Sequence, residues 1–200
     1  SGSEDETVKI WDVPAGTFSI TLPGHQSYVI ALAVLDGGRL ASGSYDCSIK
    51  IWDLAAGTCM ATLRGHQTSV RALAVLKSGR LASGSMDRTI KIWDVATCTC
   101  VATLAGHADS VNCLAVLEGG RLASGSDDGT VKIWDLATGA CMTTLEGHEN
   151  MVRCFAALED GRLASGAYDE TIKIWDLSTG ACVATLAGHG DGVYSLAVLE

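Results

Sequence analysis

The feature that most constrains this chain is a repeat of 41 residues. The five tryptophans recur at that interval, and so do the five histidines. Every residue of either type therefore belongs to the repeat. The tryptophans are Trp11, Trp52, Trp93, Trp134 and Trp175, and the histidines are His25, His66, His107, His148 and His189. Self-similarity at a fixed period decides the architecture before any local pattern does. The whole fold must therefore be built from one unit of this length.

Each unit is expected to form four β-strands. Short β-favouring runs alternate with Gly, Asp and Ser turn signals, which indicates strands of four to eight residues and not helices. In the second unit and its continuation the expected strands are residues 48–54, 59–63, 69–76 and 80–85. The turn signals between them are Ala56-Gly57, Gly65-His66, Ser78-Gly79 and Met86-Asp87. Because both faces of these strands carry apolar side chains, each sheet is expected to lie between two others.

Charge and composition exclude several classes of function. The net charge of -9 opposes the phosphate attraction on which nucleic-acid binders depend, so DNA and RNA are not expected partners. No apolar run approaches the length of a membrane span. Eight cysteines are too few for a disulfide scaffold, and no signal-like segment opens the sequence. An intracellular, cytoplasmic protein is therefore expected, with no membrane partner.

The repeat carries a family resemblance over essentially all 200 residues. A unit with Gly-His near one end and Trp-Asp near the other resembles the WD-repeat β-propeller family, in which each blade is a four-stranded antiparallel sheet. The resemblance implies an all-β fold with residues 1–200 in a single propeller domain. Each blade would run from its innermost to its outermost strand, as in residues 69–76, 80–85, 89–95 and 100–104.

Five repeats of 41 residues would give four complete four-stranded blades plus one incomplete blade shared by the two termini. The residues absent from that blade correspond to most of one strand, and an exposed edge of this kind invites pairing with another chain. Members of the family commonly close with seven blades. An excerpt of a longer propeller is the favoured interpretation, with a five-bladed ring or a multi-chain ring as alternatives.

Each repeat also supplies a His, a Ser and an Asp, the residue types of a hydrolytic triad. Chemistry needs one such set, whereas this chain repeats it beside a Trp in every blade. The resemblance implies instead a structural hydrogen-bond network, with no catalytic residue, no metal and no cofactor. The four complete sets are His25, Ser42, Asp46 and Trp52; His66, Ser83, Asp87 and Trp93; His107, Ser124, Asp128 and Trp134; and His148, Ser165, Asp169 and Trp175.

The remaining candidates for chemistry are interpreted as structural. The carboxylates that follow each Trp are expected to accept hydrogen bonds in turns. The cysteines that share one repeat position are expected to be small buried hydrophobic residues, and they are Cys59, Cys100, Cys141 and Cys182. Cys98-Thr99-Cys100 lacks a second ligand pair at the spacing of a zinc site.

Function is expected where the copies differ. Variation concentrates at repeat positions 4, 28 and 30, which in the resembled family point to one end of the ring. All four tyrosines of the chain lie at these positions, together with two of the four methionines and two arginines, a composition typical of interaction surfaces. We call these residues the rim; they are Glu4, Tyr28, Ile30, Tyr45, Ser69, Arg71, Met86, Ser110, Asn112, Asp127, Met151, Arg153, Tyr168 and Tyr194.

The sequence thus predicts a non-catalytic scaffold that presents its rim to a protein or peptide. Because Arg71 and Arg153 stand out on an acidic chain, an acidic or phosphorylated peptide is the expected ligand. Two alternatives stay open: a glycan-binding, lectin-like propeller, and a hydrolase that uses one His-Ser-Asp set.

Overall fold

A computed structural model describes residues 1–77, 79–158 and 161–198, and nearly all of its regular structure is β-strand. The first sheet contains β1 (Val8–Asp12) and β2 (Thr17–Leu22). The second contains β3 (Val29–Leu35), β4 (Arg39–Ser44), β5 (Ser48–Asp53) and β6 (Thr58–Arg64). The third contains β7 (Val70–Val75), β8 (Arg80–Ser85), β9 (Thr89–Asp94) and β10 (Thr99–Ala105).

The last two sheets have the same plan. One contains β11 (Val111–Leu117), β12 (Arg121–Ser126), β13 (Val131–Asp135) and β14 (Cys141–Leu145). The other contains β15 (Val152–Ala157), β16 (Arg162–Ala167), β17 (Thr171–Asp176) and β18 (Cys182–Ala187). A 3-10 turn, η1 (Glu118–Gly120), is the one helical element in the described residues. No helix among them is both long and apolar enough to cross a membrane.

The chain divides into two compact units, which are described separately. The first unit comprises residues 1–87 and 91–102, and the second comprises residues 88–90 and 103–200. The first thus holds the β1–β2 and β3–β6 sheets and most of β7–β10. The second holds the β11–β14 and β15–β18 sheets.

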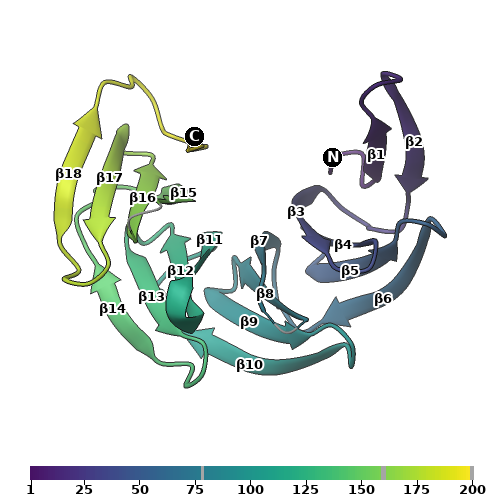
Figure 1. Ribbon diagram of the computed structural model, residues 1–200, viewed down its shortest axis with the longest axis horizontal. Coiled ribbons are helices and arrows are strands. Elements are labelled where there is room, and N and C mark those ends of the chain that lie inside the picture. The colour runs from purple at the N-terminus through teal and green to yellow at the C-terminus, as the bar shows by residue number, and fades with distance from the viewer. Residues whose placement is uncertain (78, 159–160, 199–200) are drawn as a thin grey trace. The chain divides into compact units, whose positions relative to one another are not determined.

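In each four-stranded sheet the strands pair antiparallel in chain order (Figure 1). The predicted strands are confirmed to within a residue or two: residues 69–76 form β7 at 70–75, and residues 80–85 form β8. The predicted turn at Ser78-Gly79 involves Ser78, which lies outside the described residues. The β-favouring runs and the turn signals between them therefore located the strands correctly.

Small residues let neighbouring sheets pack closely. The second strand of each four-stranded sheet reads Arg-Leu-Ala-Ser-Gly followed by Ser or Ala, and it is almost fully buried. A Cβ placed on Gly125 in β12 would lie 2.6 Å from Val152 Cγ1 of the next sheet and 2.6 Å from Cys113 Sγ. The absence of a side chain at this position is therefore what allows β15 to approach β12.

The outermost strands correct one expectation. Cys59, Cys100, Cys141 and Cys182 are exposed and not buried. Cys59, Cys141 and Cys182 each pair with the Trp of the neighbouring strand beside a register shift; Cys59, for example, pairs with Trp52 between β5 and β6. β6 is the outermost strand of its sheet and is bonded only to β5, so the side chain of Cys59 on this strand is exposed to solvent. Only Cys113 and Cys154, from another repeat position, are buried.

The incomplete blade appears as the two-stranded β1–β2 sheet. Its Trp11 is 50% exposed, whereas the four equivalent tryptophans are each 1% exposed. Phe18 packs edge-on against Trp11 and is also exposed. Residues 192–198 contain no strand.

Candidate functional site

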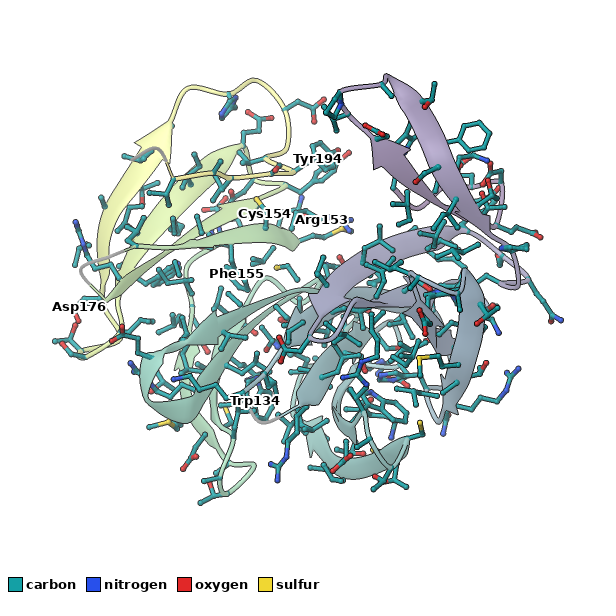
Figure 2. All side chains as sticks on the ribbon, turned by 45° about the vertical axis from the view of Figure 1, so that its right-hand side comes forward. Trp134, Arg153, Cys154, Phe155, Asp176 and Tyr194 are labelled. Carbon is teal, nitrogen blue, oxygen red and sulfur yellow. The ribbon has the colours of Figure 1, made fainter. Side chains whose placement is uncertain are left out.

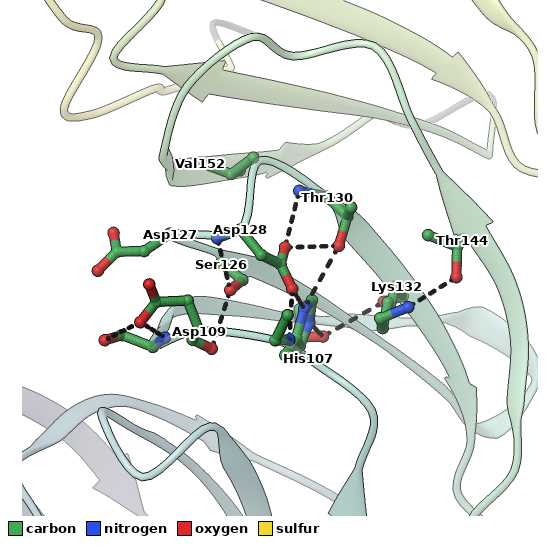
Figure 3. A network of polar contacts seen from close by, with 12 residues as sticks. His107, Asp109, Ser126, Asp127, Asp128, Thr130, Lys132, Thr144 and Val152 are labelled. Atoms are coloured by element: carbon green, nitrogen blue, oxygen red, sulfur yellow. Dashed lines mark hydrogen bonds and ion pairs between the residues drawn. The ribbon is translucent and has the colours of Figure 1, made fainter.

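The His, Ser, Asp and Trp side chains predicted to form a network do so in each of the four complete sets. In the third set, His107 Nδ1 lies 2.9 Å from Asp128 Oδ2 (Figure 3). His107 Nε2 lies 2.7 Å from Ser124 Oγ. The indole nitrogen of Trp134 donates to the same Ser124 oxygen over 2.7 Å. With the Nδ1 proton directed at the carboxylate, Nε2 is left to accept from the hydroxyl.

The other three sets repeat this arrangement closely. Their His–Asp and His–Ser distances are all 2.7 Å. Their indole nitrogens donate to the serine hydroxyl over 2.7 or 2.8 Å. All four serines have no exposed surface, and all four tryptophans are 1% exposed. The network is thus a repeated feature of the blade interior.

The glycine of each Gly-His pair allows the turn to lie on the indole. Gly106 has a φ of 157°, and a Cβ there would lie 3.2 Å from Trp134 Cη2. Gly65 has the same relation to Trp93. Both the positive φ and the close contact favour glycine. The turn thereby places the imidazole beside the indole ring, at a centroid distance of 6.2 Å for His107 and Trp134.

Hydroxyl residues complete the network, and the sequence analysis missed them. Asp128 Oδ1 accepts hydrogen bonds from Thr130 Oγ1 over 2.7 Å and from the Thr130 amide over 2.9 Å. Its other oxygen accepts from the Ala108 amide. The signal was present, since the same repeat position holds Thr or Ser in every unit: Thr7, Ser48, Thr89, Thr130 and Thr171.

These contacts shift the acid–base behaviour of the network. Burial lowers the pKa of His107 below the ordinary 6.5, although the adjacent Asp128 opposes the shift. Burial acts to raise the pKa of Asp128, but hydrogen bonds from Thr130, Ala108 and His107 outweigh it and lower that pKa to about 2. The network is therefore held with a neutral imidazole and an ionised carboxylate near neutral pH.

The carboxylates that follow each Trp hold the turns after the third strands. Asp135 Oδ1 accepts a hydrogen bond from the Ala137 amide, and Asp94 Oδ1 accepts from the Ala96 and Thr97 amides. These bonds lower the pKa of Asp135 and Asp94. Within the described residues, no three His, Cys, Asp or Glu side chains are grouped so that they could hold a metal ion.

The backbone brings rim positions 4 and 28 together in each complete sheet. The Tyr45 amide donates to the Tyr28 carbonyl over 3.0 Å, and the Tyr168 amide donates to the Met151 carbonyl over 2.9 Å. The Met86–Ser69 and Asp127–Ser110 pairs are linked in the same way. Position 30 follows in the innermost strand. The three variable positions therefore occupy the same end of each sheet.

In the first unit the rim is aromatic with one arginine. The rings of Tyr28 and Tyr45 lie 5.6 Å apart, and the Arg71 guanidinium lies over the Tyr45 ring at 5.9 Å. Tyr28 and Ile30 are each 42% exposed, and Tyr45 and Met86 are each 37% exposed. Ser69 is partly buried at the start of β7, and Glu4 is exposed in the turn before β1.

In the second unit the arginine has a carboxylate partner. Arg153 Nη2 lies 3.6 Å from Asp127 Oδ1, which also accepts a 2.7 Å hydrogen bond from Asn112. The guanidinium lies over the Tyr168 ring at 6.0 Å, and the Tyr168 and Tyr194 rings meet edge-on at 5.8 Å. Arg153 and Tyr194 lie at one end of the β15–β18 sheet, and Asp176 lies at the other (Figure 2).

One predicted rim residue does not reach the surface. Ser110 is 4% exposed, and its hydroxyl donates to Asp109 Oδ1 of the preceding residue. In the same turn before β11, the preceding residue Asp109 is exposed. Contact between Ser110 and a partner therefore stays a prediction, and Asp109 is the more exposed side chain in this turn.

Comparison with known proteins identifies the repeat. The family model described as "WD domain, G-beta repeat" matches residues 16–53, 57–94, 98–135 and 139–176, which is more than half of the chain. The chain belongs to the WD-repeat family. It is also similar to the crystal structure of the WD40 β-propeller domain of Doa1, with 32% identity and a TM-score of 0.86. That match covers 97% of this chain and 66% of the Doa1 domain.

Membership of the WD-repeat family confirms the all-β propeller fold. WD-repeat propellers are generally non-catalytic and commonly serve as protein-interaction scaffolds. The triad-like geometry of the network does not alter this assignment. A nucleophile must reach its substrate, whereas the oxygen of Ser124 has no exposed surface and already binds both His107 and Trp134.

Two surface cavities of the second unit lie away from the network. Their volumes are about 420 and about 230 Å³, and both are lined by Arg121, Gly161, Arg162 and Leu177. Neither is lined by a histidine. In this WD-repeat chain, the network and these cavities are therefore separate features.

Proposed function

We propose that this WD-repeat chain is a non-catalytic interaction scaffold and that its rim contacts a partner protein or peptide. The observation that supports this proposal is the grouping of the variable side chains. Repeat positions 4, 28 and 30 differ between copies of an otherwise similar unit. In each compact unit two exposed tyrosines lie together at these positions, with a half-buried arginine against one of them.

The composition of the rim suits protein recognition. Tyrosine and arginine are enriched among the residues that contribute most to binding, because each offers a large apolar surface together with a polar group. Tyr28, Tyr45, Tyr168 and Tyr194 are between 37% and 60% exposed. All four lie at the three variable repeat positions, which supports a role for them in recognition.

The finer proposal concerns the first unit, where Arg71 would contact an acidic or phosphorylated group. Arg71 is held against Tyr45, and the turn before its strand contains the uncharged Gln67 and Thr68. A planar guanidinium can bind a carboxylate or phosphate through two parallel hydrogen bonds. Tyr28 and Tyr45 would then pack against the apolar part of the same ligand.

A pull-down experiment tests the rim. The chain with Arg71→Glu and Arg153→Glu should lose at least about nine-tenths of the partner that the unaltered chain captures, because buried charge reversals at an interface cost several kcal/mol. The matched control is Arg64→Glu with Lys77→Glu, which changes the charge equally at exposed positions outside the rim. Full capture by the Arg71 and Arg153 variant would show that the rim is not the binding surface.

We also propose an intracellular location. All eight cysteines lie among the described residues, and all are free thiols. Free thiols, five of them exposed, suit a reducing compartment. Fractionation of cells that express the tagged protein would check the location, and recovery from the medium or from the secretory pathway would contradict it.

A further inference from the structure

Neighbouring sheets within each unit repeat one apolar contact. The Trp of a sheet packs against two residues that stand opposite each other in the preceding sheet. Trp52, for example, belongs to one buried cluster with Val8 and Leu22 of the β1–β2 sheet. The same contact joins Trp93 to Ile49 and Leu63, and Trp175 to Val131 and Leu145. Each of these tryptophans is therefore covered by an apolar pair of the sheet before it.

One Trp and one such apolar pair are exposed instead. Trp11 of the first sheet, β1–β2, is 50% exposed. In the last sheet, β15–β18, the pair is Ile172 opposite Leu186. Leu186 is 51% exposed and Ile172 is partly exposed, whereas the residues at the same two repeat positions of the other four copies are at most 3% exposed. The first sheet thus presents a Trp, and the last sheet presents the pair that covers a Trp elsewhere in the chain.

The hydrogen-bond network is divided in the same way. Trp11 Nε1 donates to Ser1 Oγ over 2.9 Å, as each buried Trp does to its own serine. Asp5 Oδ1 accepts from the Thr7 hydroxyl over 2.7 Å and from the Thr7 amide over 3.0 Å, as in the complete sets. The histidine of the fifth copy, His189, is exposed in the segment that follows β18. Three members of a fifth set are therefore assembled in the first sheet, and the fourth member follows the last sheet.

The backbone of the two segments is complementary as well. In the second sheet, the innermost strand β3 pairs with β4, with Val29 opposite Ser44. The same repeat positions fall in residues 192–198 of the last copy, which contain no strand, and in residues 1–3 of the first. Residues 1–3 already lie beside β1 through a bridge at Gly2. An unpaired strand edge favours the addition of another strand, so residues 192–198 have the sequence to pair with residues 1–3.

We propose that the last sheet of one copy binds the first sheet of a second copy of this chain, head to tail. Trp11 of the second copy packs on Ile172 and Leu186, and Ser1 and Asp5 of the second copy bind His189. Each copy carries both faces, and together they reproduce a contact that the chain already makes between its own sheets, which favours a second copy over an unrelated protein. Because the two faces differ, the contact is heterologous and can continue from copy to copy. This inference does not rest on the rim.

Sedimentation of the 200-residue chain tests the association. The mass should rise with concentration from that of one copy to that of two or more copies. Tryptophan emission should shift to shorter wavelength over the same range, because Trp11 is half exposed in a single copy, the other four indoles are already buried, and association covers Trp11. The mass of a single copy at every concentration, from submicromolar to submillimolar, would overturn the proposal.

Two variants each alter one face. Trp11→Ala removes the indole and keeps the apolar pair, whereas Leu186→Glu places a charge in the pair and keeps the indole. Each should weaken the association at least about tenfold, since a buried aromatic anchor or its apolar pocket is lost. The matched control is Met60→Ala on β6, which shortens a side chain that is 57% exposed away from both faces and should leave the association unchanged. Far-UV circular dichroism and melting curves confirm that the variants are folded.

Mixing the two variants distinguishes this contact from non-specific association. The Trp11→Ala chain offers the apolar pair and the Leu186→Glu chain offers the indole, so together they should form a complex of one copy of each. The complex should stop at two copies, because both of its outer faces are altered. His189→Ala, added to the Trp11→Ala chain, should weaken this complex about tenfold through the loss of the bonds to Ser1 and Asp5. Oligomers that persist in both single variants, or variants that stay single copies after mixing, would overturn the proposal.

Discussion

The buried imidazoles show how a single residue can resemble a catalyst and act as a structural group. His107 has the spacing of a hydrolytic histidine to both Ser124 and Asp128, yet the hydroxyl is sealed beneath Trp134. A buried polar group costs free energy unless each of its donors and acceptors is satisfied. Here every member of the set satisfies another, so that removing any one of them leaves at least one neighbour without that partner.

Asp128 is the member with the most partners, and its removal should destabilise the chain. Asp128→Ala strips an acceptor from His107, Thr130 and Ala108, so we expect the free energy of unfolding to fall by about 2–4 kcal/mol. The measurement is urea denaturation followed by circular dichroism. Glu146→Gln, at an exposed position outside the network, is the control and should cost under about 1 kcal/mol. An unchanged midpoint for Asp128→Ala would contradict the structural role of the network.

The same network predicts how stability depends on pH. Burial lowers the pKa of His25, His66, His107 and His148 below 6.5 in the folded chain. Between the folded value and 6.5 the unfolded chain binds more protons, so stability is complete above 6.5 and falls as the pH drops below it. A second loss should follow as the pH falls from 3.8 toward 2, where Asp46 and Asp128 take up protons.

Urea midpoints measured over this pH range check the dependence. The unaltered chain should show a level midpoint above about pH 6.5 and a decline below it. His107→Gln removes one of the four titrating groups, so its decline should be shallower although its stability is lower throughout. A midpoint that rises on acidification between pH 6.5 and 5 would show that the imidazoles are charged in the folded state.

At the scale of strands and sheets, the fold depends on how closely the second strand of one sheet approaches the first strand of the next sheet. Gly125 in β12 faces Cys113, Val152 and Phe155, with distances of 2.6, 2.6 and 2.9 Å from a Cβ placed there. Gly125→Ala should therefore lower the free energy of unfolding by about 1–3 kcal/mol through overpacking. Gly190→Ala has nothing within 4 Å and should be neutral in the same thermal melt. Equal melting temperatures for the two variants would contradict the packing described between β12 and β15.

The sequence located these strands because their pattern is local. Two apolar faces and regular turn signals repeat five times. A strand boundary that is ambiguous in one copy can therefore be set by comparison with the other copies. The exposure of Cys59 could not be read in this way, since it depends on a register shift opposite Trp52 and on β6 having one neighbour. Likewise, the contact between Arg153 and Asp127 joins adjacent sheets across 26 positions, where no local pattern extends.

Over the whole molecule, the eight cysteine thiols range from exposed to fully buried. Cys59, Cys98, Cys100, Cys141 and Cys182 are exposed, Cys47 is intermediate, and Cys113 and Cys154 are buried. Burial raises the pKa of Cys113 well above 9, and it raises that of Cys154 to about 11. Since the thiolate is the reactive form, both of the buried thiols are doubly protected, by their position and by their protonation.

Thiol labelling of the native chain should therefore proceed in distinct phases. With a chromogenic disulfide reagent at pH 8, we expect the five exposed thiols to react first and Cys47 to react more slowly. Cys113 and Cys154 should react only when the chain opens, so their labelling rate in increasing urea should follow the loss of β-structure. Mass spectrometry of the digested protein assigns each label. Because Cys113 and Cys154 both lie in the second unit, their labelling before any loss of β-structure would show that the packing between β12 and β15 is not maintained in solution.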